Sequence, residues 1–500
     1  MKISKKTRDL LAYIVGGTTV LIGTLLLIAI ATGWTYDLKT GELRETGLVL
    51  MGSEPSGATI SVDGKSIKQK TNYRYSNVIP GNYRLRYEKA NYRPWNSLVT
   101  VDPAEVTFAD YAWLLPNEIP QRPRYQSTPI IQAAQSPDRR RFVFVEQIAP
   151  TTDNPLVQPR LLTSTDLSRP PVALYTPPAV NATSPRRVAS YSNLTLSNDN
   201  GQLLVRVTYT DKVSEWLVMP ASPSDSPKIT NLTTELLINP SWLSWGPRGG
   251  NELYYTEKGA IRRITVNDKK ISNALAENAV YAKWSNDWLI YITDATAPAL
   301  RTVYLLPVDQ VVAEKVTTIA QSASYDSAYF RTNNTDYLAV LVGDTKQLIV
   351  NANVLRNSSQ RTTNIAGRNI TAFTVSPNGR YLVHNSNDQF VTIDYERFKR
   401  YRFQTSLAGL TSWKWMNDQH IAANLAGSVK LIDFDGQNAE LIGDGISPSS
   451  PLLFSDNKSL LFFKQIPASE TTPEKPQLTQ YFLVPDKIIE ATRSGQQTRS

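Results

Sequence analysis

The chain has 500 residues, of which 41% are hydrophobic, so it is long enough for two to four domains with buried cores. It contains no cysteine, which excludes disulfides, cysteine metal sites and thiol nucleophiles. The formal net charge is +9, but the basic residues form only one short run, at Arg139, Arg140 and Arg141. Because no dense basic stripe is present, nucleic-acid binding is not expected. A mildly basic surface facing anionic cell-wall polymers is compatible with this charge.

The N-terminus carries the pattern of a membrane anchor. No charged residue occurs between Leu10 and Trp34, a run of 25 residues, and about 20 suffice to cross a bilayer. Residues 1–9 are basic, so the positive-inside rule predicts that they are cytoplasmic and that everything after Trp34 lies outside. The alternative is a signal peptide cleaved after Ala31, where Ala29-Ile30-Ala31 resembles a cleavage site. The apolar run is longer than a signal peptide requires, which favours the anchor.

Strand periodicity begins behind a short linker. Apolar residues alternate with polar ones around Leu48, in the stretch from Ala58 to Val62, and again at Tyr83, Leu85 and Tyr87. Asp63-Gly64 has the composition of a hairpin turn. The pattern predicts a small antiparallel β-sandwich, with Tyr83 and Trp95 in its core.

This region resembles the PEGA domain family. The name-giving tetrapeptide stands as Pro55-Ser56-Gly57-Ala58, with Ser in place of Glu, and the Asp-Gly turn follows it. The second half carries the P-G-x-Y turn from Pro80 and the closing Tyr92 and Trp95. The Gly usual before that tyrosine is Asn91 here. The resemblance implies a small extracytoplasmic β-module of bacterial envelope proteins, and it implies no reaction.

The remainder of the chain repeats a turn followed by an apolar strand. The units begin at Ser136, Ser197, Trp245, Ser285, Thr332, Ser376, Met416 and Ser455. Their spacings are 61, 48, 40, 47, 44, 40 and 39 residues, the period of a four-stranded propeller blade. The units SPDRRRFVFV and SPNGRYLV resemble the repeat of TolB-type and WD40-like propellers. Eight units predict eight blades, and seven is the alternative if the long first interval hides an irregular blade.

Two structural roles follow from a propeller. The segment from Tyr481 to Val484 is a candidate for the strand that closes the ring. Five tryptophans that recur with the repeats are expected to pack between blades, namely Trp242, Trp245, Trp284, Trp413 and Trp415.

The predicted organisation is all-β: an N-terminal transmembrane helix, a small PEGA-like β-sandwich, and a seven- or eight-bladed β-propeller. The predicted segments are a cytoplasmic basic segment, a transmembrane helix, a linker, the PEGA-like domain, a second linker, the propeller and a disordered tail, over residues 1–9, 10–34, 35–46, 47–112, 113–127, 128–490 and 491–500.

The sequence offers little catalytic chemistry. The two histidines, His384 and His420, fall in strands of the repeat and are expected to be ordinary strand residues. Asp433 and Asp435-Gly436 hint at a calcium loop, but the further ligands of an EF-hand are missing, so a blade-edge turn is expected. No P-loop, G-x-S-x-G elbow or H-E-x-x-H motif occurs. We therefore expect no catalytic residues, no cofactor and no metal, and the ligand-binding residues are left open.

These features predict a non-enzymatic, single-pass protein of the bacterial cell membrane. Its propeller would bind envelope proteins or cell-wall glycans, and nucleic acid is not expected as a partner. Two alternatives remain open, a propeller-type surface glycan-active enzyme and an envelope assembly factor. Acids clustered at one axial opening of the propeller would favour the enzyme, since glycosidases use paired carboxylates.

Overall fold

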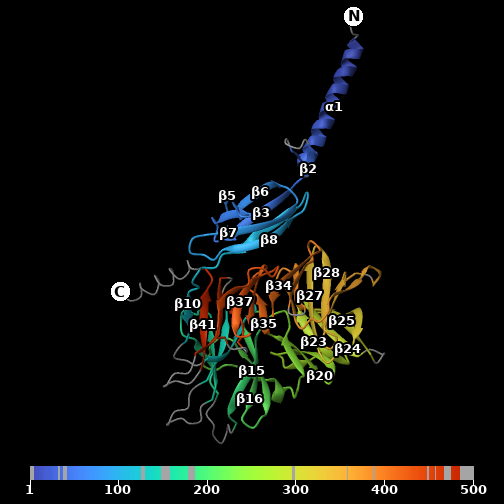
Figure 1. The fold of residues 1–500 in the computed structure, drawn as a ribbon. Coiled ribbons are helices and arrows are strands. Elements are labelled where there is room, and N and C mark those ends of the chain that lie inside the picture. Colours follow the sequence, from blue (N-terminus) through green and yellow to red (C-terminus); the bar gives the residue numbers. More distant parts are fainter. Residues whose placement is uncertain are drawn as a thin grey trace. The chain divides into compact units, whose positions relative to one another are not determined.

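A computed structural model of the chain shows two compact units, residues 1–118 and 119–500 (Figure 1). The structure describes residues 5–31, 34–37, 42–125, 130–147, 158–177, 186–294, 299–356, 358–386, 389–446, 450–455, 458–466 and 475–484. The tail predicted at 491–500 and the first four residues of the basic segment lie outside this description.

The chain begins with helix α1 (Lys5–Ala31), which is followed by a hairpin of β1 (Trp34–Asp37) and β2 (Glu42–Glu45). The segment 35–46, expected to be a plain linker, thus contributes two paired strands. Among the residues whose side chains are described, no helix combines the length and the apolar run needed to span a membrane.

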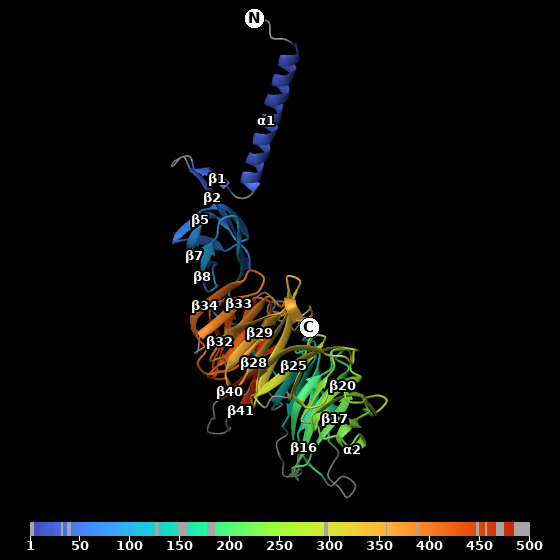
Figure 2. The same cartoon turned by 90° about the vertical axis from the view of Figure 1, so that its right-hand side faces the viewer.

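The small β-domain contains two sheets (Figure 2). The first has the order β6 (Tyr73–Val78), β3 (Gly47–Glu54), β9 (Val106–Trp113), and the second the order β5 (Lys65–Lys70), β4 (Thr59–Val62), β7 (Gly81–Glu88), β8 (Trp95–Val101). The expected hairpin is confirmed, because Asp63 and Gly64 both have positive φ and join β4 to β5. The expectation of a purely antiparallel sandwich is wrong, because the first and last strands, β3 and β9, pair in parallel. The chain passes through the second sheet between them and so returns to the first sheet in the same direction.

Three aromatic side chains join these two sheets. Tyr87 and Trp95 stack with ring centroids 4.8 Å apart, and Trp95 meets Tyr111 of the other sheet edge-on at 5.4 Å. The Tyr87 hydroxyl donates to the Ala109 carbonyl at 2.9 Å. Trp95 is therefore a core residue, as predicted. Tyr83 is not, because it is half-buried and its hydroxyl donates to the Ile79 carbonyl near the surface.

The second unit consists of four-stranded antiparallel sheets, eight of them in the described residues. The first four sheets pair their strands in chain order: β11 (Ile130–Gln135), β12 (Phe142–Glu146), β13 (Arg160–Ser164), β14 (Val172–Tyr175); β15 (Val188–Leu196), β16 (Gln202–Tyr209), β17 (Ser214–Pro220), β18 (Thr230–Asn231); β19 (Trp242–Trp245), β20 (Glu252–Glu257), β21 (Ala260–Thr265), β22 (Lys270–Ile271); β23 (Ala279–Ser285), β24 (Trp288–Asp294), β25 (Leu300–Pro307), β26 (Glu314–Ala320).

The next three sheets repeat this order: β27 (Tyr325–Thr332), β28 (Thr335–Val342), β29 (Gln347–Ala352), β30 (Thr362–Gly367); β31 (Phe373–Val375), β32 (Tyr381–Ser386), β33 (Gln389–Asp394), β34 (Lys399–Ser406); β35 (Leu410–Trp415), β36 (His420–Leu425), β37 (Ser428–Asp433), β38 (Glu440–Gly443). The eighth sheet has the order β39 (Leu453–Phe454), β40 (Ser459–Ile466), β41 (Lys475–Phe482), β10 (Gln121–Pro123). Helix α2 (Leu232–Glu235) and the 3-10 turn η1 (Ser358–Gln360) lie between strands.

The eighth sheet closes the ring with a strand from the start of the unit. β10 pairs with β41, as their adjacent labels in Figure 1 illustrate. The segment 113–127, expected to be a linker, therefore contains a strand of the propeller. The strand at Tyr481, expected to close the ring, is β41, and the strand that closes the ring is its partner β10. Repeat spacing could not reveal β10, since it stands alone before the first complete repeat. The arrangement is that of a β-propeller.

The repeated turns account for the repeated sequence. In three units a serine hydroxyl donates to the Asp or Asn two residues later at 2.5–2.7 Å, and the N–H five residues later donates back to the serine oxygen. The residue that directly follows this Asp or Asn has a positive φ. Asn and Gly tolerate this backbone conformation best. These turns span 136–141, 197–202 and 376–381. Each one reverses the chain between the first two strands of a sheet.

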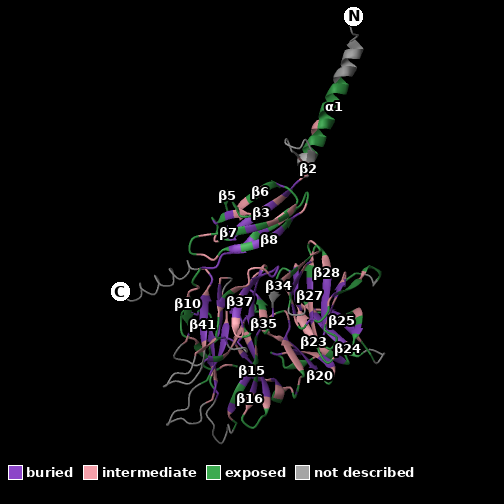
Figure 3. Cartoon of the chain, viewed as in Figure 1, coloured by how far each residue is buried: buried purple, intermediate pink, exposed green. Residues whose placement is uncertain are grey.

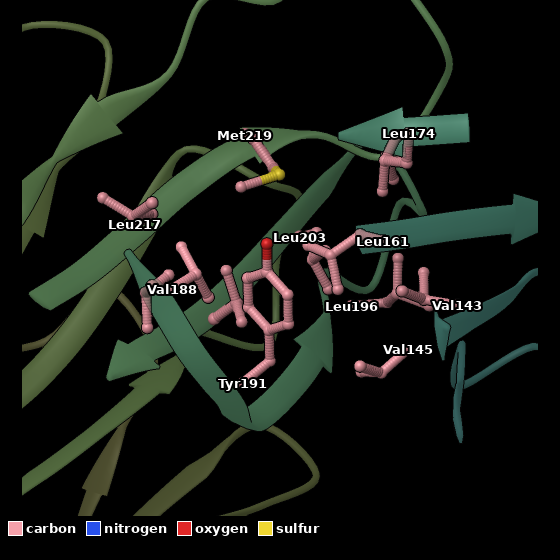
Figure 4. Close-up of a cluster of buried hydrophobic side chains, with 13 residues drawn as sticks. Val143, Val145, Leu161, Leu174, Val188, Tyr191, Leu196, Leu203, Leu217 and Met219 are labelled. Atoms are coloured by element: carbon pink, nitrogen blue, oxygen red, sulfur yellow. The ribbon is translucent and has the colours of Figure 1, made fainter. Parts of the chain in front are cut away.

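Apolar side chains fill the spaces between neighbouring sheets. Between the first and second sheets, Tyr191 lies among aliphatic side chains of both, as Figure 4 shows. The first and eighth sheets share a cluster that includes Phe144 and Phe463, so the packing is continuous around the ring. The central strands are buried along most of their length (Figure 3). Since each fully buried large apolar side chain contributes about 1.5–3 kcal/mol, this packing holds adjacent sheets together.

The aromatic core of the small domain predicts the outcome of a substitution. Trp95→Ala should destabilise this domain by about 3–5 kcal/mol, because it removes both ring contacts and leaves a cavity. Hydrogen exchange of the full-length protein should show faster exchange in β7 and β9, with the propeller strands unchanged. Tyr83→Ala is the matched control and should have a much smaller effect. Equal effects of the two substitutions would show that the core is misassigned.

Candidate functional site

The first strand of each sheet lies innermost, where neighbouring sheets meet around the axis. Between the fourth and fifth sheets, Tyr281 Oη lies 3.0 Å from Ser327 Oγ, and the Ser285 hydroxyl donates to the Tyr329 carbonyl at 3.1 Å. The Tyr329 N–H donates back to Ser285 Oγ at 2.9 Å. Polar contacts therefore join these two inner strands, and the inner strands of a propeller surround a central channel.

A cavity of about 400 Å³ opens between the inner strands β23, β27 and β31. Its lining is mostly polar and includes Lys283, Asn286, Asp326, Arg331 and Asn378. Lys283 Nζ lies 2.6 Å from Asp326 Oδ1, which also accepts the Ser327 N–H at 2.8 Å. The cavity thus offers both signs of charge and several amide and hydroxyl groups to a polar ligand.

The carboxylates at this cavity are already engaged. Asp326 is paired with Lys283, and Asp336 behind the cavity accepts the Tyr329 hydroxyl at 2.5 Å. Burial, and then the bond to Asp336, raise the pKa of Tyr329 well above its usual range, so the phenol stays protonated as a donor. In the described part of the chain, no group of three or more Asp, Glu or His side chains is placed to hold a metal ion.

Two cations meet over one phenylalanine on another side of the ring. Phe454 of the short inner strand β39 has the Arg139 guanidinium 4.6 Å from its ring centroid and Lys414 Nζ 5.3 Å from it. Arg139 reaches from the first sheet past the eighth and donates to the carbonyls of Trp415 and Met416. Burial, and then the charge of Arg139, lower the pKa of Lys414 to about 8. The Lys414 side chain keeps much of its surface in contact with solvent, so water screens part of this effect.

The two histidines lie in neighbouring sheets, His384 in the sixth and His420 in the seventh. Their side chains do not form a pair. His420 begins β36, with Nδ1 2.9 Å from Asn417 Oδ1 and Nε2 3.4 Å from Asp433. Its surroundings are those of a structural strand residue. His384 in β32 is buried, and burial lowers its pKa to about 4.

The Asp433–Gly436 segment forms a turn after β37. Asp435 accepts both the backbone N–H of Gln437 at 3.0 Å and its side-chain amide at 2.7 Å, and Asp433 accepts the Asn438 amide. Asp435 is directed to its own turn, whereas Asp433 also faces His420 Nε2 at 3.4 Å. The segment is a turn at the edge of the sheet, as expected.

Tryptophans pack between the sheets, as expected. Trp245 is buried and donates to the Thr195 carbonyl of the preceding sheet at 3.0 Å. Trp284 meets Tyr254 of the third sheet edge-on, and Trp413 meets Phe390 of the sixth. These contacts assign the aromatics to packing.

Sequence reasoning missed the lysines of the channel. Lys283 and Lys414 stand at equivalent places, each between aromatic or small residues of an inner strand, in the stretches YAKWS and SWKWM. This recurrence in the sequence could have identified the two lysines as equivalent inner-strand residues. The cluster with Arg139 was not predictable, since its three members are far apart in sequence.

Comparisons with known proteins follow the division of the chain. Residues 46–112 match the PEGA domain model. No curated protein matches the chain. Solved structures to which the chain is similar include an oligogalacturonate lyase in complex with manganese (10% identity, 74% of this chain, 99% of that chain, TM-score 0.38), a prolyl endopeptidase (10%, 70%, 54%, 0.43) and a eukaryotic initiation factor (12%, 80%, 96%, 0.42). In the chain, the matched PEGA domain is followed by the β-propeller described above, and a fold alone does not specify a reaction.

The lowered pKa of Lys414 predicts a distinctive titration. At pH 8 about half of its amines should be uncharged, whereas ordinary lysines stay protonated to about pH 10. Acylation followed by mass spectrometry should therefore reach half its maximal rate at Lys414 near pH 8. Arg139→Gln should move the Lys414 midpoint upward. A wild-type midpoint at the ordinary lysine value of 10.5 would contradict the assignment.

The same shift has a consequence for stability. Folding lowers the pKa of Lys414, so the unfolded chain holds this proton more tightly. The charged amine therefore destabilises the fold below about pH 8, by a small amount because solvent reaches this exposed side chain, and the cost disappears as the pH rises toward 10.5. Lys414→Met should raise the urea midpoint at neutral pH.

Proposed function

We propose that this chain is a membrane-tethered, non-enzymatic binding protein of the bacterial cell envelope. Its propeller is the binding platform, and its PEGA domain is the module that follows the anchor and precedes the platform along the chain. The platform takes a polar ligand, an envelope protein segment or a cell-wall glycan, in the channel.

The observation that carries the binding function is the cavity between β23, β27 and β31. Lys283 and Asp326 pair at 2.6 Å. The third charged group of the lining, Arg331, lies 3.7 Å from Asp336, which also accepts the hydrogen bond of Tyr329. A carboxyl that acts as a general acid or base must be able to exchange a proton with the substrate. Here the polar groups are arranged to form hydrogen bonds, which supports recognition.

The anchor is supported by the surface of α1. Apolar side chains are exposed around the helix: Tyr13, Ile14, Val15, Val20, Leu21, Ile22, Leu25, Leu26, Leu27 and Ile28. A helix that is apolar all round is unfavourable in water, and lipid would cover it. The part of α1 from residue 10 to residue 31 carries no charge and extends about 33 Å at 1.5 Å per residue, close to the roughly 30 Å of a bilayer core.

The proposed topology predicts a protease pattern. Protease added to spheroplasts should digest the propeller and the PEGA domain and leave the N-terminal peptide before Leu10 protected. Making Lys5, Lys6 and Arg8 acidic should weaken or scramble the orientation. Protection of the propeller in intact spheroplasts would contradict the topology.

The binding platform predicts a specific capture. The full-length protein in mild detergent should retain a partner or glycan from envelope extracts, and Lys283→Ala should reduce this retention several-fold, because it unbalances the cavity charge. Lys270→Ala, on the outermost strand of the third sheet, is the control and should retain normally. Unaltered capture by Lys283→Ala would place the platform elsewhere, and turnover of an envelope glycan by the purified protein would contradict a non-enzymatic role.

A further inference from the structure

A second cavity, of about 300 Å³, lies away from the inner strands. The end of β30 in the fifth sheet forms one wall, and strands β32, β33 and β34 of the sixth sheet form the other. We call it the basic basin, defined by Gly367, Arg368, His384, Arg400 and Arg402. Among the described residues that line it, none is acidic. Residues 387–388 lie outside the description.

The strand register places the histidine and two arginines on one face of the sheet. His384 is opposite Val391, and Val391 is opposite Arg402 in the next strand. Directly paired residues share a face, and Arg400 lies two residues from Arg402 and therefore on the same face. The Arg400 guanidinium donates to the Ala366 carbonyl, which ties it to the opposite wall.

His384 forms the floor of the basic basin. It is only 2% exposed, and its Nδ1 lies 3.2 Å from the Asn385 carbonyl oxygen. A carbonyl can only accept, so Nδ1 carries the proton and Nε2 presents a lone pair. Nε2 is buried and has no hydrogen-bond partner among the described residues. A buried acceptor without a partner is unfavourable, which points to a donor supplied by a ligand.

Burial and the nearby positive charges keep the His384 imidazole neutral. Burial lowers the pKa of His384 to about 4, and Arg400 and Arg402 act in the same direction. Burial, and then Arg402, also lower the pKa of Arg400. The two arginines therefore repel each other, and a bound anion would relieve that repulsion.

Gly367 keeps the space beside the imidazole open. A Cβ at this position would lie 2.6 Å from Ile370 Cδ1, 3.0 Å from His384 Cε1 and 3.2 Å from His384 Nε2. Real Cβ contacts are rarely so short, so a side chain here would crowd the edge of the ring that faces the basic basin.

We propose that the basic basin binds a phosphate group that carries, or lies next to, a hydroxyl donor. The arginines at the rim accept its charge, since guanidinium groups bind phosphate oxygens in a bidentate manner. The hydroxyl donates to Nε2 of His384. Free phosphate and the glycerol phosphate units of an envelope polymer share this chemistry. The proposal does not depend on the channel ligand.

Titration calorimetry of the full-length protein in neutral detergent, at constant ionic strength and pH near 7, tests the site. Inorganic phosphate should bind, and sulfate, which has the charge but no hydroxyl at this pH, should bind at least about tenfold more weakly. Arg402→Gln should weaken phosphate binding by about 10- to 100-fold, the effect of one charge-assisted hydrogen bond. Arg402 is exposed, so this variant should fold. Arg122→Gln, on exposed β10, is the control.

His384→Leu separates the two parts of the site. It removes the acceptor, so phosphate affinity should fall to that of sulfate. Displacement of phosphate by a glycerol phosphate polymer would identify the polymer as the source, and its failure to displace would identify free phosphate. The proposal is overturned if millimolar phosphate does not bind, if sulfate binds equally well to the wild type, or if Arg402→Gln binds phosphate normally.

Discussion

The pairing of β10 with β41 is the contact on which the propeller depends. A single four-stranded sheet cannot bury both faces, so every sheet needs two neighbours, and a row of sheets would leave its first and last faces exposed. The strand from residues 121–123 completes the eighth sheet, which packs against the first. Arg124 follows it directly, and its Nε and Nη2 both donate to Gln480 Oε1 in the buried seam. One short strand thereby links the two ends of the unit.

Closure also determines what the channel can hold. Inner strands of successive sheets approach closely, so hydroxyl and carbonyl groups connect them, as between Ser285 and Tyr329. Residues from distant repeats then face one another, which brings Arg139 and Lys414 onto the same ring of Phe454. The basic basin also depends on packing between sheets, but it lies away from the inner strands. One of its walls belongs to the fifth sheet and the other to the sixth. The binding surfaces are thus products of sheet-to-sheet contact.

Local features were predictable from sequence, because local chemistry produces them. The Ser-x-Asp turns and the Asp63-Gly64 hairpin have geometries that a few adjacent residues determine. The spacing of the repeated turn-and-strand units predicted eight blades, and the eight described sheets correspond to them. Trp95 was predicted as a core residue for the same reason, since it belongs to an alternating strand whose apolar face must be buried.

Features that depend on distant partners were not predictable. The alternation Tyr83-Leu85-Tyr87 is uniform, yet only Leu85 and Tyr87 are buried, because Tyr83 lies toward the end of the sheet. The parallel pairing of β3 with β9 depends on the path of the chain through another sheet. His384 looked like any strand residue, and only the approach of Gly367 and two arginines makes its Nε2 notable.

The most direct test of a closed ring is native-state hydrogen exchange, followed strand by strand in the wild type and in Gln480→Leu. This substitution leaves the Arg124 guanidinium without its acceptor in the seam. If the ring is one cooperative unit, amides of β40 in the eighth sheet and of β16 in the second should exchange through the same opening, and both should accelerate by the same factor in the variant. Acceleration confined to the eighth sheet, with β16 as protected as before, would contradict closure as the basis of the fold.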